Sequence, residues 1–201
     1  MNKDLYIVGV GASAGGIPAI NAFFDHIKPL PNVAFIVVMH LRRNYLSNLS
    51  QIISKHTSLP VTRLENDTCI QSNHIYVLIE NTFITTDNGI VKVRKREEHE
   101  IVNQAIDILF KSLAEDFKAK AIGIVFSGAG SDGLEGVKAI GKYDGYVMVQ
   151  SPYSSDVDGM PQSVVKFDQP DVIEIPEQLA KCLVKYINSK ELTYHGQPDR
   201  Q

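Results

Sequence analysis

Short apolar runs alternate with longer amphipathic segments along most of this chain. Apolar runs of about four to eight residues indicate buried strands, and segments whose apolar residues recur every three or four positions indicate helices. The first part of the chain predicts strands over Leu5–Val10, Val33–Met39 and Pro60–Leu64, with helices over Ile17–Ile27 and Leu46–His56 between them. This strand–helix–strand order predicts parallel strands joined by right-handed crossovers.

The same alternation returns in the second half of the chain. It predicts helices over Val102–Phe117, Leu134–Lys142, Pro161–Lys166 and Pro176–Asn188, and strands over Ala121–Phe126, Tyr146–Gln150 and Val172–Ile175. We therefore expect an α/β fold, a doubly wound, mostly parallel sheet in a three-layer α/β/α, Rossmann-like arrangement. Residues 1–188 are expected to form one domain, and the polar, patternless residues 189–201 a tail or linker.

A different pattern occupies the middle of the chain. Three short β-rich runs, Ile75–Ile79, Thr82–Thr85 and Ile90–Arg94, are separated by turn residues, and the Asn-Gly pair between the last two is a strong hairpin signal. We expect an antiparallel hairpin insertion at the edge of the sheet. The charged run Lys92–Glu100 is either a solvated hairpin end or a docking patch for a partner.

Composition narrows the class of protein. The net charge of −3 gives no basic face for nucleic acid. No apolar run approaches the roughly 18 residues of a membrane span, and the N-terminus does not resemble a signal peptide. The two cysteines, Cys69 and Cys182, are expected to be reduced, buried thiols of a cytoplasmic protein, and no residue cluster has the spacing of metal ligands.

A glycine-rich turn joins the first strand to the first helix, over residues 9–16. Ser13 is the only side chain in this turn with a reactive group. The N–H groups of Ala14, Gly15 and Gly16 are expected to point the same way as its hydroxyl, at the positive end of the helix dipole. The turn therefore suits either an anion or a nucleophilic serine with an oxyanion site.

Dinucleotide binding is one hypothesis for this turn, since Gly9-x-Gly11-x-x-Ala14 fits a loose fingerprint. That fingerprint expects an acidic residue about 20 residues later, at the end of the second strand, to hold the ribose. The second strand ends instead in His40, and no Asp or Glu lies between Asp25 and Glu65.

A serine hydrolase is the other hypothesis. Ser13, His40 and Asp132 each follow the carboxyl end of a predicted strand, and such ends meet at one edge of a parallel sheet. If the first strand is central, neighbouring strand ends about 4.8 Å apart bring the three within hydrogen-bond reach. His40 would then take the serine proton, and Asp132 would hold the imidazole tautomer.

Four motifs together resemble the catalytic domain of the chemotaxis protein-glutamate methylesterases, the CheB type. They are GASAGG after the first strand, the histidine after the second, SGAGSDG, and the segment from Gln150-Ser151-Pro152 to Gly159-Met160-Pro161. The match runs in order from Leu5 to Ile187. It implies a doubly wound sheet with a hairpin, and it maps the family's serine, histidine and aspartate onto Ser13, His40 and Asp132.

The resemblance implies hydrolysis of glutamyl methyl esters on chemoreceptor-like signalling helices, with deamidation of glutamines as a related activity and no cofactor. It also implies a methyltransferase or receiver domain as partner, in the same chain or a separate one. Arg42, Met160 and Pro161 are the residues expected to line the substrate groove.

The chain departs from the family pattern near its three central residues. Ala14, Ala129 and Met39 stand where the family often has threonine, methionine and glutamine. These departures motivate a rival hypothesis, an inactive or weakly active methylesterase-like module that binds receptors or signalling partners without turnover.

Overall fold

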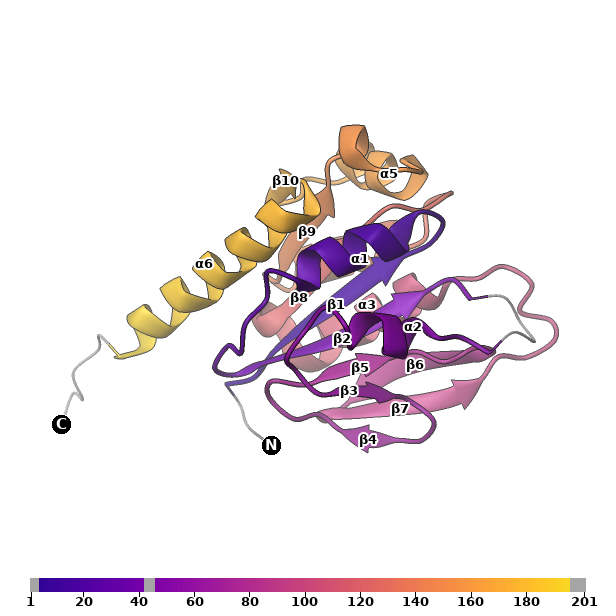
Figure 1. Cartoon of the computed structure of the whole chain (residues 1–201), viewed down its shortest axis with the longest axis horizontal. Helices are drawn as coiled ribbons and strands as arrows, with labels where there is room; N and C mark the ends of the chain where they lie inside the picture. The colour runs from indigo at the N-terminus through magenta and orange to yellow at the C-terminus, as the bar shows by residue number, and fades with distance from the viewer. Residues whose placement is uncertain (1–3, 42–45, 196–201) are drawn as a thin grey trace.

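The computed structural model describes residues 4–41 and 46–195. Its main sheet has seven strands in the order β10-β9-β8-β1-β2-β5-β3, and every neighbouring pair is parallel (Figure 1). The strands are β1 (Tyr6–Ala12), β2 (Val33–Met39), β3 (Val61–Arg63), β5 (Ile75–Val77), β8 (Ala121–Val125), β9 (Tyr146–Gln150) and β10 (Val172–Glu174). The predicted doubly wound α/β sheet is confirmed.

Strand β1 lies at the centre of this sheet. Its residues pair with β2 on one side, from Tyr6↔Val33 to Ala12↔Met39, and with β8 on the other. After β1, the chain first adds β2, β3 and β5 on one side of it and then adds β8, β9 and β10 on the other. The strand order therefore reverses beside β1. Ligands of open parallel sheets bind at such a reversal, outside the carboxyl ends of the strands.

Helices cover both faces of the sheet because successive strand side chains point to opposite faces. Ile7 packs on the face covered by α3 and α4, whereas Val8 and Val10 pack on the face covered by α1 and α6. Figure 1 shows α1 and α6 side by side on that second face. The helices are α1 (Gly16–Phe24), α2 (Leu49–Ile53), α3 (Ala105–Phe117), α4 (Leu134–Lys142), α5 (Gly159–Phe167) and α6 (Pro176–His195), with short 3₁₀ turns at Lys118–Lys120 and Pro152–Ser154.

Two glycines of β1 let α3 approach the sheet closely. A Cβ atom on Gly9 would lie 2.6 Å from Leu113 of α3, and one on Gly11 would lie 2.5 Å from Ile106. Both distances are shorter than real Cβ contacts, so a side chain at either position would force the packed side chains of α3, or the helix itself, to shift. These glycines therefore serve helix–strand packing, and the tight turn begins only after Ala12.

A separate three-stranded antiparallel sheet, in the order β4-β7-β6, contains the predicted hairpin. Its strands are β4 (Thr68–Cys69), β6 (Thr82–Asp87) and β7 (Ile90–Lys95). Asn88 and Gly89 form the two-residue turn with φ of 51° and 72°, the left-handed conformation that such hairpins require.

Two expectations about this region are wrong. The run predicted over Ile75–Ile79 is not part of the hairpin, because β5 inserts in parallel between β2 and β3 of the main sheet. Strand β4 was not predicted, since two residues carry no detectable period. Its Cys69 is exposed and Cys182 of α6 is only half-buried, so the expectation of two buried thiols is wrong.

The last helix is longer than expected. It was predicted to end at Asn188, and α6 continues to His195. The added residues are mostly polar and carry no apolar stripe, which explains why no core-facing pattern marked them. Residues 196–201 lie outside the described residues, so a tail or linker there stays a prediction.

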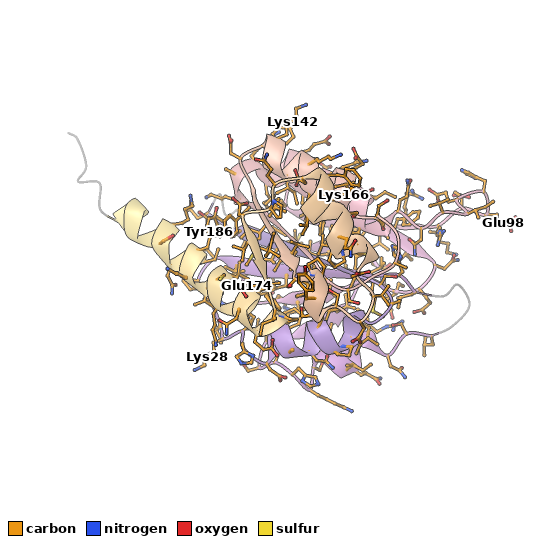
Figure 2. All side chains as sticks on the ribbon, turned by 90° about the horizontal axis from the view of Figure 1, so that it is seen from above. Lys28, Glu98, Lys142, Lys166, Glu174 and Tyr186 are labelled. Atoms are coloured by element: carbon orange, nitrogen blue, oxygen red, sulfur yellow. The ribbon has the colours of Figure 1, made fainter. Side chains whose placement is uncertain are left out.

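The charged run Lys92–Glu100 forms the end of β7 and the loop that follows. Figure 2 places Glu98 at one end of the molecule, with Tyr186 on α6 toward the other. Glu100 accepts two hydrogen bonds from the Arg94 guanidinium, at 2.7 and 2.9 Å, which lower the pKa of its carboxyl to about 2. Arg94 thus pairs with Glu100 inside the run, whereas Lys92 pairs with Asp67 outside it.

Candidate active site

Ser13 and His40 lie side by side at the carboxyl edge of the sheet. Each is the first residue beyond the last paired residues of β1 and β2, Ala12 and Met39. The His40 N–H donates to the Ala12 carbonyl at 3.1 Å, which extends the strand pairing by one step. Both side chains border one open cavity of about 540 Å³.

His40 is joined to Asp132 by a short hydrogen bond. The distance from His40 Nε2 to Asp132 Oδ2 is 2.6 Å, and the side chains are 21% and 6% exposed. An ionised carboxylate only accepts hydrogen bonds, so Nε2 carries the proton and Nδ1 is the nitrogen with a free lone pair. In the chymotrypsin triad the carboxylate holds the other nitrogen, Nδ1.

The Asp132 carboxylate is held at the N-terminus of α3. Oδ2 accepts the N–H of Ile106 at 3.0 Å, and Oδ1 accepts the N–H of Asp107 at 2.9 Å. The first N–H groups of a helix have no partner within the helix, and the dipole favours negative charge there. His40 and Asp132 lie 92 positions apart in the chain, and helix α3 orients the carboxylate that joins them.

Asp107 is a buried residue of this site that sequence reasoning missed. It is 7% exposed, and its Oδ1 accepts the N–H groups of Gly133 at 2.9 Å and Gly136 at 2.7 Å. Burial raises the pKa of the Asp107 carboxyl, and the Asp132 charge adds to the rise. Its position in a helical run with an apolar face made it look like an ordinary polar residue.

Ser127, at the start of the second glycine-rich turn, connects three loops. Its side chain is fully buried, and its hydroxyl lies 2.8 Å from the Ala14 carbonyl and 3.1 Å from the Val157 carbonyl. The hydroxyl also accepts the Val157 N–H at 3.0 Å, and the Ser127 carbonyl accepts the Ser13 N–H at 2.9 Å. Sequence reasoning treated this residue as part of a turn and missed this role.

The contact with Ser127 orients the peptide between Ala14 and Gly15. In a trans peptide the carbonyl and the N–H point in opposite directions. Because the Ala14 carbonyl points at Ser127, the Gly15 N–H points away from it. Gly15 has φ of 71°, a conformation that glycine adopts without strain.

Two of the three expected N–H donors are available. Within the described residues, the N–H groups of Ala14 and Gly15 have no hydrogen-bond acceptor. The Gly16 N–H donates to the Ser13 carbonyl at 3.0 Å, so the expectation that it is free is wrong. The Ser13 hydroxyl itself makes no hydrogen bond with any described residue, so the contact between Ser13 and His40 is not formed in this structure.

Two of the three residues expected to line a substrate groove are buried. Met160 is fully buried at the start of α5, where its N–H donates to the Gly128 carbonyl at 2.8 Å. Pro161 beside it is buried as well. The expectation that these two line an open groove is wrong, and Arg42 lies outside the described residues.

Within the part of the chain that the structure describes, no group of three or more histidine, cysteine or acidic side chains is placed to hold a metal ion. Over the same residues, no helix is long and apolar enough to cross a membrane.

Comparisons with known proteins agree on one family. The sequence profile described as CheB methylesterase matches residues 8–183. A Burkholderia pseudomallei protein named protein-glutamate methylesterase/protein-glutamine glutaminase 2 is 25% identical over 182 residues, which cover 90% of this chain and 53% of that protein. A Leptospira interrogans protein named for the same two activities is 27% identical over 188 residues, which cover 92% of this chain and 95% of that protein.

A solved structure with the same family name shares the fold. The crystal structure of the Thermotoga maritima CheB methylesterase catalytic domain matches with a TM-score of 0.80 at 23% identity, covering 90% of this chain and 98% of that one. This chain spans about half the length of the Burkholderia relative, 53% of it. Because the family profile matches most of its length and its fold is shared with that catalytic domain, the chain belongs to the CheB methylesterase family.

Proposed function

We propose that the chain is a protein-glutamate methylesterase that hydrolyses glutamyl methyl esters on chemoreceptor-like signalling proteins. The observation that carries the proposal is the short bond from His40 to Asp132 at the rim of the cavity that His40 shares with Ser13. A serine, a histidine and an anchored carboxylate at one sheet edge are the groups that ester hydrolysis needs.

In the first step, the Ser13 oxygen attacks the ester carbonyl while His40 takes the hydroxyl proton. The acceptor is Nδ1, since Nε2 faces Asp132. The negative oxygen of the tetrahedral intermediate is stabilised by the N–H groups of Ala14 and Gly15. When the intermediate collapses, methanol leaves with the proton from His40, and the glutamyl group stays on Ser13 as an ester.

In the second step, water attacks this acyl-enzyme and His40 takes its proton. The ionised Asp132 stabilises the imidazolium that forms in both steps. The glutamate carboxylate is released and Ser13 is restored. Glutamine deamidation follows the same sequence with ammonia as the leaving group, so one set of residues serves both activities.

The test is methanol release from a peptide or receptor fragment carrying a glutamyl γ-methyl ester. The Ser13→Ala variant is expected to lower the rate by about 10³–10⁶-fold. Ser72→Ala, the same substitution at an exposed loop residue away from the cavity, is the matched control and should retain the wild-type rate. Methanol release by Ser13→Ala at the control rate would exclude this assignment.

A binding module without turnover is the second candidate, and the absence of a hydrogen bond between Ser13 and His40 is the observation that raises it. Catalytic hydrogen bonds are often long in unliganded sites and shorten with substrate, so this geometry is compatible with both candidates. A fluorophosphonate separates them because it labels only an activated serine. Labelling at Ser13 supports the esterase, and methylated-receptor binding without labelling supports the module.

A further inference from the structure

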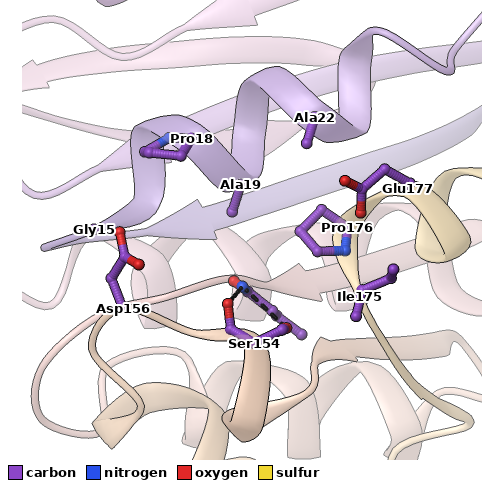
Figure 3. Close-up of a pocket in the computed structure, with 10 residues that line it drawn as sticks. Gly15, Pro18, Ala19, Ala22, Ser154, Asp156, Ile175, Pro176 and Glu177 are labelled. Atoms are coloured by element: carbon purple, nitrogen blue, oxygen red, sulfur yellow. Dashed lines mark hydrogen bonds between the residues drawn. The ribbon is translucent and has the colours of Figure 1, made fainter.

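A second cavity lies beside the proposed active site, between α1 and the start of α6 (Figure 3). It is an open groove of about 300 Å³. Ala19 and Ala22 of α1 form one wall, and Ile175 and Pro176 form the opposite wall. No step of the proposed reaction uses this groove.

The groove adjoins the cavity of Ser13. Gly15, Pro18 and Asp156 border both cavities, so a side chain close to an ester bound at Ser13 lies near the groove. Asp156 lies close against the serine turn, since a Cβ on Gly15 would be 2.6 Å from the Asp156 Cβ. The loop before α5 that carries Asp156 is held there through Ser127 and Val157.

Carboxylates stand at both ends of the groove. Figure 3 shows Asp156 beside Gly15 and Glu177 beyond Pro176, with Ala19 between them. Neither carboxylate forms an ion pair or a side-chain hydrogen bond with any described residue. The groove therefore offers negative charge without a cation of its own.

Gln150 and Ser154 also line the groove, and the Gln150 amide donates to the Ser154 carbonyl at 2.9 Å. Apolar walls, these neutral polar groups and two carboxylates together match one kind of side chain. Lysine and arginine bury a methylene stem against apolar surface while the charged head stays in a polar setting. An acidic side chain would be repelled by Asp156 and Glu177, and a neutral apolar one would gain no electrostatic attraction from either carboxylate. The charge and the shape of the groove thus favour a basic side chain.

We propose that this groove is a specificity site for a lysine or arginine side chain of the substrate protein, close to the glutamyl methyl ester. The proposal rests on the proposed function, because it takes Ser13 as the place where the ester binds. Asp156 and Glu177 are the specificity-determining residues, and they contact the substrate without taking part in the bond changes.

The experiment uses helical peptides with a single glutamyl γ-methyl ester and a lysine or norleucine placed at each nearby position in turn. Norleucine keeps the methylene stem and removes the charge. Methanol release gives kcat/KM, and fluorescence anisotropy gives Kd for the same peptides. The variant is Asp156→Asn with Glu177→Gln. The charge-matched control is Asp144→Asn with Glu115→Gln, at two exposed residues outside the lining of the groove.

At one or more positions, lysine is expected to raise kcat/KM about tenfold over norleucine, the scale of one or two partly exposed ion pairs. The double variant loses this preference, the control keeps it, and added salt weakens it. Equal values for lysine and norleucine at every position in the wild type would overturn the proposal. A preference that survives in the double variant would also overturn it.

N-acetylglutamate γ-methyl ester, which is too small to reach the groove, separates the two proposals. If neither it nor any peptide is hydrolysed, the proposed function fails. The anisotropy measurement then still tests whether the groove binds a basic side chain. Lysine-dependent binding that the double variant loses supports the groove proposal, and equal binding of the lysine and norleucine peptides overturns it.

Discussion

Asp132 caps the N-terminus of α3, the helix that contains Asp107, and Asp107 caps the N-terminus of α4, the helix that follows Asp132. Asp132, just before α4, accepts N–H groups from the first turn of α3, where Asp107 lies. Asp107 in turn accepts the N–H groups of Gly133 and Gly136 at the start of α4. The carboxylate that bonds His40 is therefore held directly by the N-terminus of α3, and Asp107 ties that helix to the start of α4, just after Asp132.

Replacing Asp107 separates its role as a hydrogen-bond acceptor from the effect of its buried charge. Asp107→Asn keeps the Oδ1 acceptor for both glycine N–H groups and removes the buried charge, so its free energy of unfolding should stay within about 1 kcal/mol of the wild type. Asp107→Ala leaves two buried N–H groups unpaired and should lose about 2–4 kcal/mol. Urea unfolding measures both, and equal losses in the two variants would contradict the capping role.

Stability should also depend on pH through Asp107. Burial raises the pKa of this carboxyl in the folded state above its unfolded value, so the folded state binds its proton more tightly. Its contribution to stability is present below the unfolded pKa of about 4 and is lost as pH rises through the folded pKa. The unfolding free energy of the wild type, measured relative to Asp107→Asn, should therefore fall over that range. A difference that rises with pH would contradict the assignment.

Asp132→Asn should lower kcat for ester hydrolysis by about 10²–10⁴-fold. An amide has one acceptor atom, so it cannot serve both His40 Nε2 and the two N–H groups of α3. Asp144→Asn, at an exposed residue with φ of 60°, is a matched control and should retain wild-type kcat. A wild-type kcat for Asp132→Asn would remove Asp132 from the mechanism.

Gly11→Ala and Gly141→Ala should change stability in opposite directions. The new methyl group at Gly11 meets Ile106 at 2.5 Å between β1 and α3, which should cost about 1–3 kcal/mol. Gly141 lies in α4 with nothing within 4 Å of an added Cβ, so alanine should add up to about 1 kcal/mol. Thermal unfolding of both variants decides this, and a stabilised Gly11→Ala variant would contradict the close packing.

Ser127→Ala should affect both stability and catalysis. It removes the hydroxyl from the buried Ala14 carbonyl and Val157 N–H, at a cost of about 1–3 kcal/mol. The peptide that points the Gly15 N–H at the oxyanion is then less well held, so kcat should fall more than KM rises. A stable variant with unchanged kcat would show that Ser127 serves the fold alone.

Patterns along the chain predicted the main sheet well because its strands are buried on both faces. The bounds predicted for Val33–Met39, Leu134–Lys142 and Tyr146–Gln150 agree with β2, α4 and β9. The run predicted over Ile75–Ile79 failed for a physical reason: a three-residue strand between two longer connections does not show which sheet it joins.

Strand ends also placed Ser13, His40 and Asp132 at one edge, because topology alone determines where such residues meet. The supporting contacts could not be predicted in this way. The bonds of Asp107 and Ser127 depend on the angle at which α3 packs and on the path of the loop before α5. Neither quantity leaves a periodic trace in the sequence.

The central position of β1 has a consequence for biosynthesis. β1 can pair with β2 soon after both leave the ribosome, but its other edge waits for β8, more than a hundred residues later. The turn with Asp132 comes after β8, so a nascent chain holds its serine and histidine long before their carboxylate arrives. Esterase activity is therefore expected to switch on late, when the second half of the sheet closes against the first.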